Sequence, residues 1–230
     1  MERDCKTKKV DQVIPQIGLT IPKYSVNKQM PSIAKGVDIR SLKPQELFRI
    51  ACWRVCPDFQ VDDPSLLNEI FLYLINRSSV FDSMKGLWLC GNIGTGKSTM
   101  LKICREFQML YSKANGCSGG FLITSASKVV TEYSMQGIQG INRYVSSDKP
   151  ISVAFDELGR EPIPGKYFGT EMNVMQFIFQ MRYEQRTDAK TYVSTNMLKG
   201  AIPEVYGRYI ADRVKEMFNI IELNGESRRL

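Results

Sequence analysis

The chain has 230 residues, of which 43% are hydrophobic and 24% charged, a composition ordinary for a globular protein. This length supports a core without disulfide bonds, so a disulfide-stapled mini-protein is excluded. The longest apolar runs, at 70–75 and 87–90, are far shorter than the roughly 18 residues that a membrane helix requires. The charged first ten residues also lack the apolar region of a secretory signal. We therefore expect a cytoplasmic protein with no membrane partner.

The sequence contains no histidine. Ser-His-Asp triads, Cys-His nucleophile pairs and zinc sites that require imidazole are thereby excluded. The six cysteines form no C-x-x-C pair, and only Cys52 and Cys56 are close, at helical spacing. We expect reduced thiols rather than a metal site.

The net charge of +7 is concentrated near the start of the chain, where residues 1–50 carry ten Lys/Arg against five Asp/Glu. Residues 1–42 contain Pro15, Pro22 and Pro31 and no sustained helical period, so they predict a basic extended arm. Its lysines would neutralise nucleic-acid phosphates if they bind them. A solvated tail explains the same charges, and the sequence leaves both interpretations open.

Residues 43–79 predict a short helical region that packs on the rest of the chain. In residues 44–56 the apolar positions recur at helical spacing. Asp63 and Pro64 then form an N-cap and first-turn pair, and a second apolar stripe continues to about Asn76.

From Gly86 onward, short apolar runs alternate with helical segments, which is typical of a parallel α/β sheet. The expected strands are 87–90, 120–124, 151–155, 190–194 and 218–223, and the expected helices are 97–113, 127–137, 171–186 and 203–216. The strands are apolar on both faces, as expected where helices cover each side. The predicted fold is an α/β three-layer sandwich around a parallel five-stranded sheet.

Residues 91–99 fit the phosphate-binding pattern G-x-x-x-x-G-K-[ST], between a predicted strand and a predicted helix. Glycines let such a loop turn tightly and aim its N–H groups at phosphate oxygens, at the positive end of the following helix. Lys97 is predicted to reach the β- and γ-phosphates of ATP, and Ser98 to hold Mg²⁺. The alternative is a glycine-rich structural turn. The predicted nucleotide-binding residues are Gly91, Asn92, Ile93, Gly94, Thr95, Gly96, Lys97, Ser98 and Thr99.

The apolar segment 151–155 is followed by two acids, Asp156 and Glu157, which is the form of a Walker B element. Asp156 is predicted to join Ser98 in the Mg²⁺ shell. Glu157 is predicted to orient and polarise a water molecule for in-line attack on the γ-phosphate. A surface acid pair is the alternative, but a hydrolytic base is what an ATPase needs and a small-molecule kinase does not.

The strand 190–194 also ends in polar residues, Thr195 and Asn196. In a P-loop ATPase with an inserted central strand, this strand would lie beside the Walker B strand. Asn196 would then reach the attacking water or the γ-phosphate. Thr195 is the second candidate for this role, and an ordinary turn after a strand is the alternative.

Two arginines, Arg208 and Arg213, lie on the predicted helix before the last strand. An arginine supplied by a neighbouring subunit stabilises transition-state charge in ring or spiral ATPases. We favour Arg213 for this role, with Arg208 as second choice. The alternative for Arg213 is a surface salt bridge to Asp212 or Glu216.

In chain order, the P-loop, FDELG, RYEQR, VSTN, YGRYIADR and GESRR resemble the DnaC/DnaI/IstB type of AAA+ ATPase, a family of helicase loaders and transposition ATPases. The resemblance covers about residues 80–230 and implies ATP and Mg²⁺ as cofactors. It further implies a homo-oligomeric ring or spiral with single-stranded or duplex DNA along its inner surface, and a replicative helicase or transposase as partner. Arg213 matches the position of the arginine finger of the family.

The sequence departs from the family at both ends. We expect no C-terminal helical lid, because about seven residues follow the last predicted strand. Arg228 and Arg229 are candidates to substitute for the sensor-2 arginine that such a lid carries. The leading region lacks the cysteine and histidine spacing of loaders that carry a zinc domain.

The segment 160–170 is rich in Pro and Gly and predicts a mobile contact to DNA or to a neighbouring subunit, with Lys166, Tyr167 and Phe168 as the phosphate and stacking groups. A plain connector is the alternative interpretation.

Together these features predict an arm over 1–42, a helical region over 43–79 and an AAA+-type P-loop ATPase domain over 80–230. The predicted function is that of a helicase-loader-like DNA-replication ATPase, in which ATP-dependent oligomerisation is coupled to DNA and helicase binding. The alternatives are an IstB-like transposition helper, a P-loop nucleotide or small-molecule kinase, and a nucleotide switch that does not hydrolyse ATP.

Overall fold

The computed structural model describes residues 38–57, 59, 63–225 and 227. Most of the predicted basic arm lies outside the described residues. The described chain begins with a short 3-10 helix, η2 (Ile39–Ser41), which Asp38 caps by accepting from the Arg40 amide.

The centre of the molecule is a five-stranded sheet with strand order β2-β3-β6-β1-β7, and every pairing in it is parallel. Its strands are β1 (Gly86–Cys90), β2 (Leu122–Ser125), β3 (Val153–Leu158), β6 (Thr191–Thr195) and β7 (Phe218–Glu222). The predicted parallel α/β sheet is therefore confirmed. The predicted place of β6 beside the Walker B strand β3 is also confirmed.

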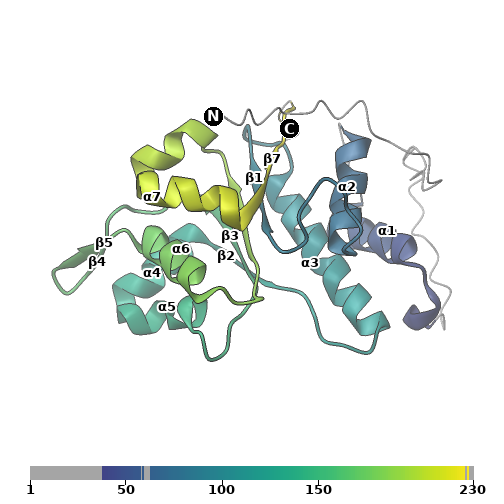
Figure 1. Ribbon diagram of the computed structural model, residues 1–230, viewed down its shortest axis with the longest axis horizontal. Helices are drawn as coiled ribbons and strands as arrows, with labels where there is room; N and C mark the ends of the chain where they lie inside the picture. The colour runs from purple at the N-terminus through teal and green to yellow at the C-terminus, as the bar shows by residue number, and fades with distance from the viewer. Residues whose placement is uncertain (1–37, 58, 60–62, 226, 228–230) are drawn as a thin grey trace, which may run out of the picture.

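Helices cover both faces of this sheet, which gives the three layers of Figure 1. One face carries α1 (Pro44–Val55), α2 (Pro64–Leu74) and α3 (Lys97–Ala114). The other carries α4 (Ala126–Gln136), α5 (Ile138–Val145), α6 (Val174–Gln185) and α7 (Ile202–Met217).

The helical pair α1 and α2 is joined to the sheet domain through an aromatic cluster. The ring of Phe48 lies 5.2 Å from that of Phe71 and 5.4 Å from that of Phe107 on α3. All three side chains are buried, and each burial stabilises the fold by about 1.5–3 kcal/mol. The α1 helix is therefore fixed against α3, the helix that follows the P-loop.

The structure differs from the predicted elements after β2 and after β3. Residues 138–145 form a separate helix, α5, which begins where Gly137 turns the chain with a positive φ of 62°. The predicted helix 171–186 begins later, because β5 (Thr170–Met172) pairs with β4 (Gly165–Tyr167) in an antiparallel hairpin. The Asn173 side chain then accepts from the Gln176 amide and caps α6.

In the part of the chain that the structure describes, none of the helices combines the length and the apolar character needed to cross a membrane.

Candidate nucleotide site

The P-loop runs from the end of β1 to the first turn of α3, as the motif predicts. Gly91, Gly94 and Gly96 all have positive φ angles, between 84° and 130°, a region that side-chain-bearing residues rarely adopt. At Gly91 an added Cβ would lie 2.3 Å from the carbonyl oxygen of Leu223. The glycine spacing is therefore required by the backbone, and the loop lies at the carboxyl edge of the sheet, where open α/β sheets bind ligands.

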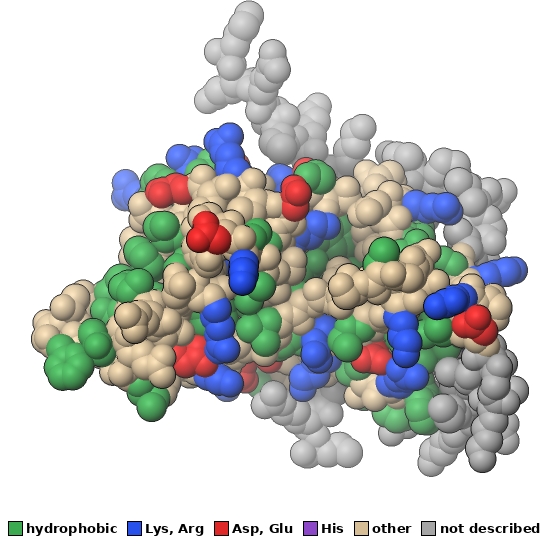
Figure 2. All heavy atoms as spheres, turned by 90° about the horizontal axis from the view of Figure 1, so that it is seen from below, with side chains coloured by type: hydrophobic (Ala, Val, Ile, Leu, Met, Phe, Trp, Pro, Cys, Tyr) green, Lys and Arg blue, Asp and Glu red, His purple; other side chains and the backbone are tan. Residues whose placement is uncertain are grey.

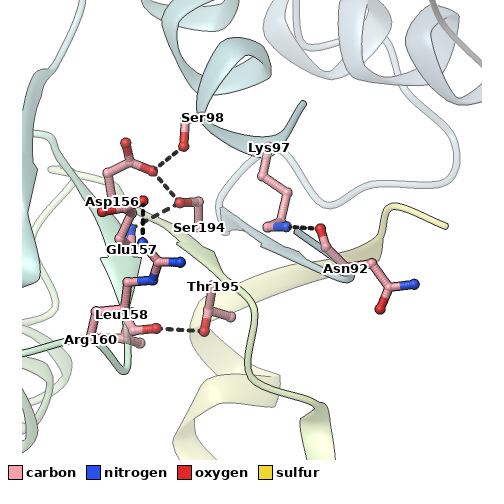
Figure 3. Close-up of polar contacts among 9 residues, drawn as sticks. All are labelled: Asn92, Lys97, Ser98, Asp156, Glu157, Leu158, Arg160, Ser194 and Thr195. Atoms are coloured by element: carbon pink, nitrogen blue, oxygen red, sulfur yellow. Dashed lines mark hydrogen bonds and ion pairs between the residues drawn. The ribbon is translucent and has the colours of Figure 1, made fainter. Parts of the chain in front are cut away.

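Lys97 turns back into this loop. Its ammonium donates to the carbonyl oxygens of Gly91, at 2.9 Å, and Asn92, at 2.5 Å (Figure 3). The side chain is only 7% exposed, and a buried ammonium is stable only where oxygen atoms surround it. Lys97 therefore places a positive charge inside the loop, where the backbone N–H groups of a P-loop receive phosphate.

Ser98 and Asp156 meet across the site. The Ser98 hydroxyl donates to Asp156 Oδ1 at 2.7 Å, and the Ser194 hydroxyl of β6 donates to the same oxygen (Figure 3). Hydroxyl and carboxylate oxygens are hard donors that suit Mg²⁺, which proteins hold with one or two carboxylates together with substrate phosphates. These two residues fit that ion, although no cluster of three or more metal-ligating His, Cys, Asp or Glu residues exists among the described residues.

Glu157 follows Asp156 in a strained turn, with a φ of 57°. Its amide donates to the Ser194 hydroxyl at 3.1 Å. Its carboxylate accepts from the Arg160 guanidinium at 3.1 Å, in an ion pair that is close to half exposed on both sides (Figure 3). Arg160 is thus a site residue that sequence reasoning missed, although its spacing three residues after Glu157 is typical of a pair across one turn.

Thr195 and Asn196 occupy different positions at the end of β6. Thr195 is buried, and its hydroxyl donates to the Leu158 carbonyl at 2.7 Å and accepts from the Met197 amide at 2.9 Å. Asn196 is exposed at the wall of the cavity. The Thr195 hydroxyl therefore holds the two strand ends together, which leaves Asn196 as the better placed of the two for a ligand.

An open cavity of about 360 Å³ joins these groups, within the range of roughly 300–1,000 Å³ typical of small-molecule sites. Its lining residues are Cys56, Phe59, Ile93, Gly94, Gly96, Lys97, Ser98, Thr99, Glu157, Arg160, Ser194, Thr195 and Asn196.

Cys56 and Phe59 reach the cavity from the end of α1, which sequence reasoning did not foresee. No motif marks either residue. They add a sulfur atom and an aromatic ring to a lining that otherwise carries Lys97, Glu157 and Arg160.

Arg213 does not line this cavity. Its guanidinium pairs with Asp212 at 3.3 Å and with Glu216 at 3.1 Å, and lies over the rings of Tyr183 and Tyr209. A hydrogen bond to Tyr209, followed by the nearby charges, raises the pKa of this guanidinium above its usual value. Within one chain, Arg213 is therefore held on α7 in its charged form. The surface salt bridges to Asp212 and Glu216, which were the alternative to a role as arginine finger, are both present.

Arg208 lies on the same helix and lines a second cavity, together with Pro203 and Lys215. Neither arginine lines the nucleotide cavity of its own chain.

Scans of the sequence against protein-family models and against curated proteins find no match. Solved structures do match. The solved chain of DnaI is 22% identical with a TM-score of 0.53, and the alignment covers 82% of this chain and 95% of the solved one. The DnaC helicase loader is 16% identical with a TM-score of 0.53, with 75% and 98% covered. A protein described as a primosome component from Streptococcus pyogenes serotype M3 is 19% identical with a TM-score of 0.50, with 76% and 87% covered.

At these identities the likeness is one of fold. It agrees with the strand order, in which β6 lies between β3, which carries the acid pair, and β1, which precedes the P-loop. The chain therefore has the α/β fold of DnaI and of the DnaC helicase loader, and the fold class predicted from the sequence is confirmed.

Proposed function

We propose that this protein binds ATP with Mg²⁺ and hydrolyses the γ-phosphate. One observation carries the proposal: a single cavity is lined by the buried Lys97, by Ser98, whose hydroxyl donates to Asp156, and by a second acid, Glu157. A glycine-rich turn with a purely structural role would require neither the buried lysine, nor the serine–aspartate pair, nor Glu157. A phosphate-binding module without turnover would not require Glu157.

Each residue has a distinct task in this reaction. The loop amides and Lys97 hold the phosphates, and Ser98 with Asp156 would hold Mg²⁺, which neutralises charge on the phosphate oxygens. Glu157 accepts a proton from the attacking water, for which its carboxylate must turn away from Arg160. Asn196 supplies an amide that orients this water.

The test is ATP hydrolysis by the purified chain, measured as phosphate release, for the wild type, Lys97→Ala and Glu157→Gln. We expect turnover in the wild type and its loss in both variants, with nucleotide binding retained only in Glu157→Gln. Retained turnover in Lys97→Ala would contradict the assignment. Binding without phosphate release would identify a nucleotide switch, and transfer to an added acceptor instead of water would identify a kinase.

We further propose that turnover serves DNA replication, in the manner of a helicase loader that forms a ring or spiral on DNA. The support is the fold match over 95% of the solved DnaI chain and 98% of the solved chain of the DnaC helicase loader. Pull-down with a hexameric replicative helicase and with a transposase separates this proposal from the transposition helper. Capture by the transposase alone would favour that helper.

The β4–β5 hairpin is the proposed DNA contact. Phe168 at its tip is 93% exposed, with its ring 4.8 Å from that of Tyr167. Tyr167 in turn packs against Tyr133, so the tip has a fixed base. Lys166 is paired with Glu171 at 2.7 Å, which leaves stacking as the main contribution of the hairpin. Hydrophobic side chains gather at the end of the molecule from which the hairpin projects (Figures 1 and 2).

Phe168→Ala should weaken binding of single-stranded DNA by about fivefold to a hundredfold, because one base–aromatic stack contributes about 1–3 kcal/mol. Fluorescence anisotropy with a labelled oligonucleotide measures this change, and ATP hydrolysis without DNA provides the control. Unchanged DNA affinity would remove the hairpin from the proposed DNA surface.

A further inference from the structure

A buried carboxylate ties the turn after Glu157 to helix α7. Glu161 is only 7% exposed. Its Oε2 accepts from the Gly159 amide at 2.7 Å, and its Oε1 accepts from the hydroxyl of Tyr206. Glu161 is the one acid among the described residues whose side chain is counted as buried, and it belongs to none of the motifs already assigned.

These two bonds connect segments that are far apart in the sequence. Gly159 lies two residues beyond Glu157, inside the same turn, whereas Tyr206 lies 45 residues beyond Glu161. A buried carboxylate is costly unless donors satisfy it, so the turn and the helix are held in one relative position. Burial raises the pKa of Tyr206 above its usual value, which keeps its hydroxyl protonated and able to donate.

Tyr206 also lies at a break in α7. Gly207, the next residue, has φ 82° and ψ 157°, which interrupts the helix. The preceding residue is fixed from the other side, since Asn173 donates to the Val205 carbonyl at 3.0 Å. The segment beyond Gly207 carries Arg208 and Arg213. Tyr206 therefore connects the turn after Glu157, through Glu161, to the part of α7 that carries the two arginines.

We propose that Tyr206 and Glu161 are positioning residues that hold the Glu157 turn against α7, so that the placement of the Glu157 carboxylate depends on α7. This inference rests on the proposed ATPase function. Neither residue lines the nucleotide cavity. They act on the rate of hydrolysis through Glu157 and contact neither Lys97, which holds the phosphates, nor Ser98, which would hold Mg²⁺.

Tyr206→Phe removes only the hydroxyl and tests this role. We expect kcat to fall about tenfold, the effect of losing one hydrogen bond to a charged group. The Kd for a fluorescent, non-hydrolysable ATP analogue should stay within about twofold, because nucleotide binding depends on the P-loop. Glu161→Gln should also lower kcat, since one amide oxygen cannot replace two carboxylate oxygens. The double variant should lose little more than either single variant.

Tyr144→Phe is the matched control. Tyr144 is as fully buried as Tyr206, and its hydroxyl donates to a glutamate, Glu132, at 2.8 Å. That pair joins α4 to α5. The Tyr144 ring packs against Phe155 of β3, but the hydroxyl that the variant removes bonds to Glu132 and Arg143 rather than to the segment 157–161. The control therefore removes the same chemical group from the same kind of bond, and it should leave kcat unchanged.

Three outcomes overturn the inference. They are an unchanged kcat in Tyr206→Phe, an equal loss of kcat in Tyr144→Phe, and a loss of analogue affinity in Tyr206→Phe as large as its loss of rate. A wild-type chain that binds the analogue but releases no phosphate contradicts the proposed ATPase function itself. A wild type that hydrolyses ATP alongside an equally active Tyr206→Phe contradicts the positioning role alone.

Discussion

The two ends of the nucleotide cavity are built in different ways. The phosphate end comes from one continuous stretch, in which Lys97 is fixed by the carbonyl groups of Gly91 and Asn92 from its own loop. The hydrolytic end is assembled from separate segments. There, Ser194 of β6 contacts both Asp156 and the Glu157 amide of β3. Nucleotide binding should therefore withstand changes elsewhere in the fold, whereas hydrolysis should depend on how distant segments fit together.

The largest effect should come from the phosphate end. Lys97→Ala removes the buried ammonium, and the loop then lacks the charge that offsets the phosphates. We expect nucleotide binding and hydrolysis to be abolished together. Isothermal titration with ATP and Mg²⁺ measures the first and phosphate release the second, with circular dichroism as the control for folding. If Lys97→Ala lost hydrolysis but bound ATP as tightly as the wild type, nucleotide binding would not depend on the phosphate end.

The next largest effect should come from Arg213, and its size shows whether a second subunit contributes to the hydrolytic end. Arg213→Ala should lower kcat by about 10³-fold or more, the lower range for an arginine finger supplied in trans. Mixing it with Glu157→Gln should restore part of the activity, because one subunit then supplies Arg213 and its neighbour Glu157.

Arg208→Ala is the matched control for this experiment, as it removes an arginine from the same helix. An inactive Arg208→Ala beside an active Arg213→Ala would transfer the role to Arg208. An Arg213→Ala variant as active as the wild type would show that its contacts with Asp212 and Glu216 are all that it contributes.

A smaller effect should come from the hydrogen bonds that connect β6 to β3 at Ser194. Ser194→Ala deletes the hydroxyl that contacts Asp156 and the Glu157 amide, and we expect kcat to fall about tenfold with ATP affinity little changed. Ser152→Ala is its control, since the Ser152 hydroxyl also links segments beside β3 and β6, by accepting from the Lys190 amide at 3.1 Å. A comparable loss in both variants would indicate general sheet stability rather than a local effect on the acids.

The same difference explains what could be predicted from the sequence. The P-loop is local, so its glycine spacing and the strand and helix around it identify Lys97 and Ser98 without a structure. The place of β6 beside β3 was predicted from the strand order of P-loop ATPases with an inserted central strand, and the structure confirms it.

Contacts between distant segments could not be predicted in this way. Phe59 reaches the cavity from the end of α1, and Tyr206 reaches Glu161 from α7. No periodicity or motif records such pairings, because they depend on how the helices pack. The β4–β5 hairpin was missed for a local reason, since strands of three residues between Pro and Gly carry too little alternation to differ from a loop.

The smallest effect should come from Arg160, which pairs with Glu157 at the exposed edge of the hydrolytic end. An exposed pair of this kind contributes at most about 1 kcal/mol, and Glu157 must leave it to contact water. We therefore expect Arg160→Gln to raise kcat, by less than about fivefold. Arg54→Gln, which removes an exposed pair with Glu106 on the helical face, should leave kcat unchanged. A tenfold fall in Arg160→Gln would instead assign Arg160 to phosphate binding, and the phosphate end would then no longer consist of one continuous stretch.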